Sequence, residues 1–216
     1  MAVRPQTPGE FKRTLRKLAE ADSNLAAAID RFGEPEFWHR QPGFATLVLF
    51  ILEQQVSLAS GAAAFNRLRA RVGDVIPAAI LIPSDEELRA DGFSRQKSRY
   101  VRELARAVLD GRIDLVSLES RPDDQVRREL IGLIGIGPWT ADVYLLSCLR
   151  RPDVWPVLDR ALQVATGEVL GLETIPDSAV LLELGERWRP HRSTAARLMW
   201  HSYLSKRGRK ESAFEV

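Results

Sequence analysis

Residues 133–141 read Leu133-Ile134-Gly135-Ile136-Gly137-Pro138-Trp139-Thr140-Ala141. It separates an amphipathic segment, 123–133, from an apolar helical segment, 140–149. Gly135 and Gly137 allow backbone conformations that other residues resist, and Pro138 suits the first turn of a helix, where its missing N–H donor is not needed. The sequence therefore predicts two helices joined by a tight hairpin, over residues 123–149.

The hairpin also indicates a kind of ligand. Glycines leave their amide groups uncovered by side chains, and uncovered amides at the start of a helix bind phosphate without reading base sequence. A glycine turn can equally join two packed helices and bind nothing. The hairpin alone does not separate these two interpretations.

Helical periodicity dominates the rest of the chain, and alternating strand patterns are nearly absent, so we predict an all-α protein. Pro and Gly breaks divide it into about ten short helices, with helix starts expected at Ser84, Pro122-Asp123 and Pro176-Asp177. The main periodic segments are 11–19, 45–68, 100–109, 181–188 and 192–204.

Composition excludes several classes of protein. The longest apolar run, 44–52, is too short to span a membrane, so we expect a soluble, cytoplasmic protein. A monomer is expected as well. Cys148 is the one cysteine, which excludes an internal disulfide framework and a four-cysteine cluster. The three histidines, at 39, 191 and 201, have no metal-binding spacing. We therefore expect no metal-dependent hydrolysis.

Positive charge is unevenly distributed, although the net charge is only +2. The chain has 26 arginines and 5 lysines, and two of its stretches, 92–102 and 187–210, contain cations but no acid. Arginine offers a phosphate forked hydrogen bonds as well as charge. The two stretches fit a surface for a phosphate backbone, although solvated helix faces explain such runs as well.

A second motif carries the chemistry. In the segment 153–162 an aspartate, Asp159, follows an extended Trp-Pro-Val sequence and opens a helix. A carboxylate there can simply cap the helix, or it can stabilise positive charge on a reacting group and orient a water molecule. Asp142 and Asp153 are weaker candidates, because one lies inside a helix and the other in an Arg-Pro-Asp turn.

Taken together, these motifs resemble the helix–hairpin–helix DNA glycosylases, in the branch that contains 3-methyladenine DNA glycosylase II. The resemblance covers about 44–204, and also takes in Ile51-Leu52-Glu53-Gln54-Gln55-Val56-Ser57 and the segment from Arg187 through Ser193 to Trp200. It implies a single module, 1–216, with two helical lobes. One lobe is 44–150, and the other is 1–43 plus 151–216.

The resemblance also implies roles for individual residues. Asp159 is the expected catalytic residue, in a cleft between the lobes with Trp139 and Trp200. Gln55 is expected to fill the gap left by an extruded nucleotide. No cofactor or metal is expected, except that the hairpin carbonyls offer a site where similar proteins often hold a monovalent cation; the sequence leaves open whether one binds here. Trp139, Trp200, Val143 and Arg160 are expected to line the base pocket, and Gly135, Gly137, Thr140, Arg192 and Ser193 to contact the DNA backbone.

One position separates the branches of this superfamily. In members that also cut the DNA strand, a lysine precedes the Thr-Ala pair and attacks the sugar. Trp139 stands there, and an indole cannot form a Schiff base, so water must be the nucleophile. The predicted function is a monofunctional glycosylase that removes alkylated purines such as 3-methyladenine from double-stranded DNA in base excision repair. The alternatives are a glycosylase of the same fold for deaminated or oxidised bases and a non-catalytic DNA-binding module.

Overall fold

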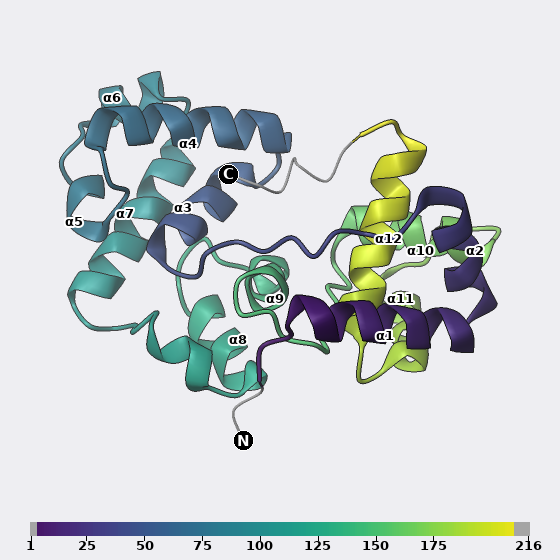
Figure 1. Cartoon of the computed structure of the whole chain (residues 1–216). Coiled ribbons are helices and arrows are strands. Elements are labelled where there is room, and N and C mark those ends of the chain that lie inside the picture. The colour runs from purple at the N-terminus through teal and green to yellow at the C-terminus, as the bar shows by residue number, and fades with distance from the viewer. Residues whose placement is uncertain (1–3, 210–216) are drawn as a thin grey trace. The chain divides into compact units, whose positions relative to one another are not determined.

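A computed structural model describes residues 4–209, and every regular element in that range is a helix (Figure 1), as the periodicity predicted. The α-helices are α1 (Pro8–Ala21), α2 (Ser23–Phe32), α3 (Phe44–Glu53), α4 (Leu58–Val72), α5 (Pro77–Ile80), α6 (Asp85–Ala90), α7 (Arg95–Leu109), α8 (Asp123–Ile131), α9 (Pro138–Ser147), α10 (Arg160–Leu170), α11 (Ser178–Gly185) and α12 (Arg192–Lys206). Two short 3-10 helices, η1 (Ser117–Ser120) and η2 (Glu186–Trp188), complete the list.

Local capping chemistry sets many of these boundaries. Ser84 forms a reciprocal capping box with Glu87 at the start of α6, and the side chain of Asp177 accepts two backbone N–H groups at the start of α11. Helix α8 begins at Asp123, directly after Pro122, without a side-chain cap. All three helix starts expected from the sequence are confirmed.

One periodic segment, 45–68, is two helices. The break falls at residues 54–57, where Gln55 adopts a left-handed backbone conformation with φ of 59°. The apolar pattern continues across this break, because α3 is buried on all sides and α4 buries one face against it. Periodicity alone therefore could not reveal it.

The described residues form two compact units. Unit 1 contains 40–144, and unit 2 contains 4–39 and 145–209. The chain passes from one unit to the other at 39/40 and at 144/145. Both boundaries fall a few residues before those of the predicted lobes, which are 44–150 and 1–43 plus 151–216. Arg40 belongs to unit 1 because it pairs with Glu53, and Leu146 belongs to unit 2 because its carbonyl accepts a hydrogen bond from Arg197.

Unit 1 is built around α3, which packs against α4 and α7. Eight of the ten residues of α3 are buried, so this helix is covered on all sides. Gly61 of α4 lies so close that an added Cβ would come within 2.7 Å of Glu53. Helices α5 and α6 pack on α7, and the hairpin between α8 and α9 lies in the same unit (Figure 1).

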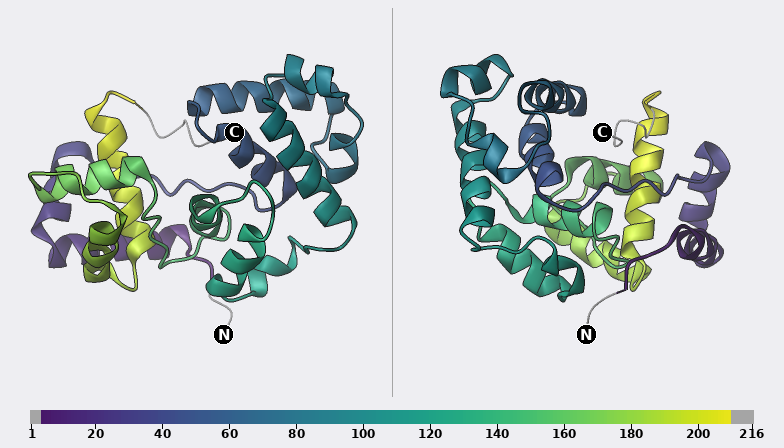
Figure 2. Two further views of the ribbon diagram at one scale, coloured as in Figure 1. Left: turned by 180° about the vertical axis from the view of Figure 1, so that it is seen from behind. Right: turned by 60° about the vertical axis from the view of Figure 1, so that its left-hand side comes forward.

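Unit 2 is built around α12, which packs against α1, α2 and α10 (Figure 2). Every residue from Ser193 to Trp200 is buried, including one arginine. Helix α1 contributes Phe11, Leu15 and Leu18, whose spacing places them on one face. The central position of α12 matters for function because the helix carries Trp200 and contacts α10, which begins directly after Asp159.

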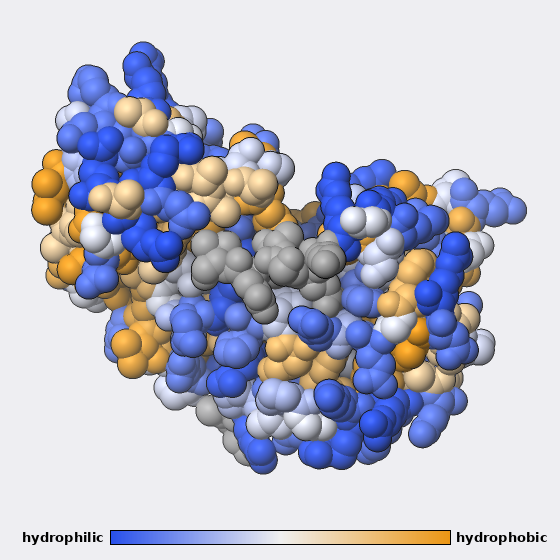
Figure 3. All heavy atoms as spheres, turned by 45° about the horizontal axis from the view of Figure 1, so that its top comes forward, coloured by the Kyte–Doolittle hydropathy of each residue, from blue (hydrophilic) through white to orange (hydrophobic). Residues whose placement is uncertain are grey.

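One face of the molecule is mostly polar (Figure 3). Figure 3 shows a largely hydrophilic face with scattered apolar residues, which is usual because a folded protein has too little polar surface to cover itself completely. Within residues 4–209, none of the helices combines the length and the apolar character that crossing a bilayer requires.

Candidate active site and DNA-binding surface

Asp159 is the N-cap of α10 and is half-buried. Its Oδ1 accepts the backbone N–H of Leu162 at 2.7 Å and the indole Nε1–H of Trp200 at 3.0 Å. The loop before it is held by Gln163, whose side-chain amide donates to the carbonyl of Val157 at 3.0 Å. The carboxylate is therefore fixed by donors from two helices, in the manner of a group that must keep one orientation.

Trp200 is buried to 5% exposure and has an aromatic neighbour that the sequence did not reveal. Its ring packs against Trp38 with centroids 5.9 Å apart, and the guanidinium of Arg197 lies over Trp38 at 4.5 Å. Arg197 also donates to the carbonyls of Trp38 and Leu146. Trp38 and Arg197 therefore support the indole that contacts Asp159.

The other residues predicted to line the base pocket are divided between the two units. Trp139 and Val143 belong to the part of α9 in unit 1, where both are half-buried and, four residues apart, share one face of the helix. Arg160 is the exposed first residue of α10, and its guanidinium donates to Gln163 at 3.1 Å. Their contact with a flipped base stays a prediction.

Asp142 and Asp153, the weaker carboxylate candidates, both lie in ion pairs. Asp142 accepts from Arg127 at 2.6 Å, and Asp153 accepts a forked hydrogen bond from Arg192. Each carboxylate therefore holds two segments of its unit together. These contacts support the choice of Asp159 as the reactive group.

The hairpin between α8 and α9 contains two glycines, and the two positions differ in backbone conformation and in the space around them. Gly135 has φ of 92°, and a Cβ there would come within 2.4 Å of Tyr100. The expectation that Gly137 also needs an unusual backbone conformation is wrong, since its φ is not positive and a Cβ would meet no atom within 4 Å. The absence of a side chain at Gly137 therefore leaves the surface open.

Several amides of this hairpin are available to a ligand. The N–H groups of Gly132, Leu133 and Ile136 donate to backbone carbonyls of unit 1. Over the described part of the chain, those of Ile134, Gly135 and Gly137 donate to no other group. Pro138 begins α9 directly after them, as the sequence predicted. Amides so placed bind an anion such as a backbone phosphate.

Gln55 lies in the turn between α3 and α4, next to well-anchored residues. Its side chain is exposed, and its positive φ is uncommon for a residue other than glycine. Lys97 of α7 donates to the carbonyl of Leu52 at 2.6 Å, and burial lowers the pKa of this amine. The turn thus presents Gln55 to solvent from a fixed helix end.

Three residues predicted to contact the DNA backbone have side chains that serve the fold. Thr140 is buried, and its hydroxyl lies 3.4 Å from the side-chain amide of Gln54. Ser193 is 1% exposed, and its hydroxyl donates to the carbonyl of Arg151 at 2.6 Å and accepts from the amide of Val154. Arg192 holds Asp153, as described above. These hydroxyls and the Arg192 fork position loops, so direct contact between these side chains and phosphate is not favoured.

The two basic stretches also differ in how they are used. In 187–209 most cations pair with acids from other segments, as Arg187 does with Asp22 and Arg207 with Glu168, and Arg197 is buried. In 92–102, by contrast, Arg95 and Arg99 are exposed on α7, and within residues 4–209 neither forms an ion pair. The positive charge of Arg95 and Arg99 is therefore available to a binding partner.

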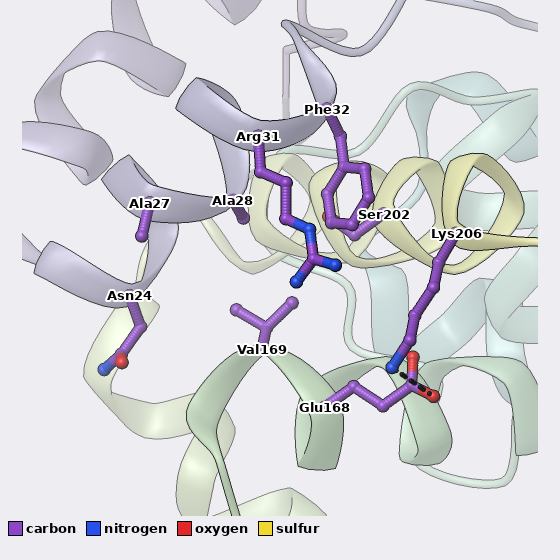
Figure 4. A pocket seen from close by; sticks show the side chains of 9 residues that line it. All are labelled: Asn24, Ala27, Ala28, Arg31, Phe32, Glu168, Val169, Ser202 and Lys206. Carbon is purple, nitrogen blue, oxygen red and sulfur yellow. Dashed lines mark ion pairs between the residues drawn. The ribbon is translucent and has the colours of Figure 1, made fainter.

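A small pocket of about 130 Å³ lies in unit 2, between α2, α10 and α12 (Figure 4). Glu168 and Lys206 form an ion pair of 3.2 Å in its wall, and the figure shows Arg31 reaching in from α2. None of the predicted site residues lines this pocket. Among the described residues, no three His, Cys, Asp or Glu side chains come together as a set of metal ligands.

A helical fold, a hairpin with open amides and a capped aspartate held by an indole together define a DNA-binding protein with a candidate reaction centre. Comparison with known proteins leads to the same class of protein. The chain belongs to the HhH-GPD superfamily of base excision DNA repair proteins, whose family model matches residues 48–190.

Individual relatives extend beyond that range. The alkylbase DNA glycosidase-like protein mag2 of Schizosaccharomyces pombe is 24% identical over 200 residues, which cover 88% of this chain and 93% of that protein. The solved 3-methyladenine DNA glycosylase Mag1 of the same yeast, in complex with abasic DNA, is similar with a TM-score of 0.80 and 25% identity, covering 87% of this chain and 95% of that one. The DNA-3-methyladenine glycosidase of Bacillus halodurans has a TM-score of 0.77 and 29% identity, covering 95% and 94%.

Proposed function

We propose that this protein is a monofunctional DNA glycosylase that extrudes an alkylated purine such as 3-methyladenine from duplex DNA and hydrolyses its N-glycosidic bond. The observation that carries the proposal is the carboxylate of Asp159, fixed by Leu162 and Trp200. The names of the similar glycosylases support the choice of an alkylated base as substrate. A cytoplasmic monomer, associated with the nucleoid in a bacterium, is part of the same proposal.

The reaction follows from the charge that develops on the sugar. A purine methylated on a ring nitrogen carries positive charge, so the bond from C1′ to the base breaks with its electron pair leaving on a neutral base. Positive charge then forms on the deoxyribose, and the carboxylate of Asp159 stabilises it. Water adds to C1′, and its proton passes to the carboxylate and then to solvent. The products are the free base and an abasic site.

The absence of a strand-cutting step is the finer part of the proposal. Trp139 occupies the position that a lysine takes in the strand-cutting branches, and an indole offers no amine for a Schiff base with the sugar. The abasic strand should therefore leave the enzyme intact.

Binding to DNA is proposed to use the hairpin and α7. The open amides of Ile134, Gly135 and Gly137 suit one phosphate, and the exposed guanidinium groups of Arg95 and Arg99 add charge on the same unit. Neither contact reads bases. These residues should therefore contribute affinity without sequence preference.

A monovalent cation at the hairpin remains a prediction, and the proposed reaction requires no other cofactor. The carbonyls of Leu133, Gly135 and Gly137 each accept one hydrogen bond within unit 1. A carbonyl oxygen keeps a second lone pair, and oxygen ligands of this type suit hard cations. Such an ion would supply positive charge near a bound phosphate, and no chemical step depends on it.

The test is chromatographic detection of the bases released from methylated DNA. We expect 3-methyladenine to appear, and parallel duplexes containing hypoxanthine, uracil or 8-oxoguanine to release little. Preferred release of one of these other bases would assign the protein to a different lesion. Tight DNA binding without release of any base would show that it is a binding module.

A further inference from the structure

The last residue of α3 and the two residues that follow it have side chains in three different environments. Glu53 is buried and forms a forked ion pair with Arg40, with both N–O distances 2.8 Å. Gln54 is half-buried, and Gln55 is exposed with its backbone in the left-handed region. Glu53 and Gln54 are therefore held by different partners, whereas the side chain of Gln55 faces solvent.

Gln54 links this turn to the phosphate-binding hairpin. Its side-chain amide Nε2 donates to the carbonyl of Gly135 at 2.8 Å and lies 3.4 Å from the hydroxyl of Thr140. Gly135 is 81 positions away in the sequence, so the bond joins two distant segments of unit 1. Tyr100 packs against Gly135 and fixes the hairpin from another side.

The helix end itself is held independently of Gln54. Lys97 anchors the carbonyl of Leu52, and Arg40 anchors Glu53. Loss of the Gln54 amide should therefore leave α3 folded and change only how the turn is held against the hairpin. A residue in a costly backbone conformation, as Gln55 is, keeps it only when its surroundings enforce it.

We infer that Gln54 is a positioning residue that couples the grip of the hairpin on phosphate to the placement of Gln55 in the DNA stack. When the hairpin binds a phosphate, the bond from Gln54 to Gly135 holds the turn in register with the duplex. The side chain of Gln55 then enters the base stack of the DNA at a defined position along the duplex. This inference rests on the proposed function.

The test uses Gln54→Met, which keeps the length of the side chain and removes its donor without adding charge. Gln125→Met is the matched control, because Gln125 is also a half-buried glutamine of unit 1, but its amide bonds to Glu129 on its own helix. Gln55→Ala shows the effect of losing the wedge itself. Extrusion is measured by the fluorescence of 2-aminopurine placed at the target position, which does not require excision.

We expect Gln54→Met and Gln55→Ala to reduce the 2-aminopurine signal, while Gln125→Met keeps it. Excision of a lesion in paired DNA should fall about tenfold with Gln54→Met, the scale of one hydrogen bond. Excision of the same lesion in an unpaired bulge should stay near the wild-type rate, because extrusion is then nearly complete beforehand. Melting temperature and affinity for undamaged duplex should be unchanged.

Two results would overturn the inference. One is a Gln54→Met variant with wild-type fluorescence and excision. The other is an equal loss on paired and bulged substrates together with a lower melting temperature, which would indicate a purely structural role. If the wild-type enzyme raised 2-aminopurine fluorescence but released no alkylated base, the proposed function would fail while the coupling by Gln54 would stand.

Discussion

The indole Nε1–H of Trp200 donates to Oδ1 of Asp159 across 3.0 Å, and the same oxygen accepts the amide of Leu162. The aspartate thus has a second partner beyond the one that an ordinary N-cap needs. Because Trp200 lies in the middle of the buried helix α12, the position of the carboxylate is tied to the core of unit 2. This contact distinguishes a prepared reactive group from a simple cap.

Replacing Trp200 with Phe should therefore slow base release more than it destabilises the fold. Phenylalanine keeps an aromatic ring beside Trp38 but removes the donor, and a hydrogen bond to a charged group contributes on the order of 1.5–3 kcal/mol, or about 10- to 100-fold in rate. Single-turnover excision measures the effect.

Trp155→Phe is the matched control for that experiment. Trp155 is also 5% exposed and in unit 2, but its indole donates to the carbonyl of Leu181. We expect this variant to excise at close to the wild-type rate. Equal losses in both variants would mean that the hydrogen bond to Asp159 has no special role.

Changing Gly137 to Val should weaken binding to every DNA sequence alike. The added Cβ would meet no neighbouring atom within 4 Å, so the fold should tolerate the substitution, but the valine side chain would cover the amides that approach phosphate. Binding to several undamaged duplexes measures the change, and Gly9→Val on α1 serves as a control in the other unit. A selective loss for one lesion, with undamaged DNA bound normally, would show that the hairpin does not act as a phosphate clamp.

Much of this site could be predicted from the sequence, because its parts are local. The glycine hairpin, Pro138 at a helix start and Asp159 as an N-cap all depend on residues within a few positions of one another. The family assignment followed from the order and spacing of such motifs, and the match over 48–190 confirms it.

The partners that come from distant segments could not be predicted. Trp38 lies against Trp200 and Gln54 bonds to Gly135, and neither pair has a spacing that periodicity can reveal. Charge runs were misleading for the same reason. Arg197 falls in an acid-free basic stretch, which indicates a surface, yet the residue is 1% exposed and hydrogen-bonded to two carbonyls.

Removing the charge of Arg95 and Arg99 together should weaken DNA binding and its dependence on salt. Each lost phosphate contact reduces the slope of log K against log salt by about 0.9, so the double alanine variant should lose about 2. Arg106→Ala with Arg112→Ala removes the same charge near the other end of α7, where both arginines pair with acids. An equal change of slope in this control variant would mean that only the net charge of the protein matters, and that Arg95 and Arg99 do not contact phosphate.

Borohydride should trap no covalent adduct between the enzyme and lesion-containing DNA, and strand breaks should appear only after heat or alkali. The reason is Trp139, which replaces the reactive amine. Burial lowers the pKa of Lys97, which makes its amine the one to examine first if an adduct forms. Efficient trapping that Lys97→Arg abolishes would contradict the monofunctional mechanism.

The most direct measurement is the single-turnover release of 3-methyladenine from methylated duplex DNA by wild-type protein and by Asp159→Asn. Asparagine keeps an oxygen acceptor for Leu162 and Trp200 and caps helices as well as aspartate, so folding and DNA binding should persist. The rate should fall by at least about a hundredfold, because the charge that stabilises the sugar is gone. Asp177→Asn, at another aspartate N-cap of unit 2, should leave the rate unchanged. Near-wild-type release by Asp159→Asn would show that the carboxylate of Asp159 does not take part in the reaction.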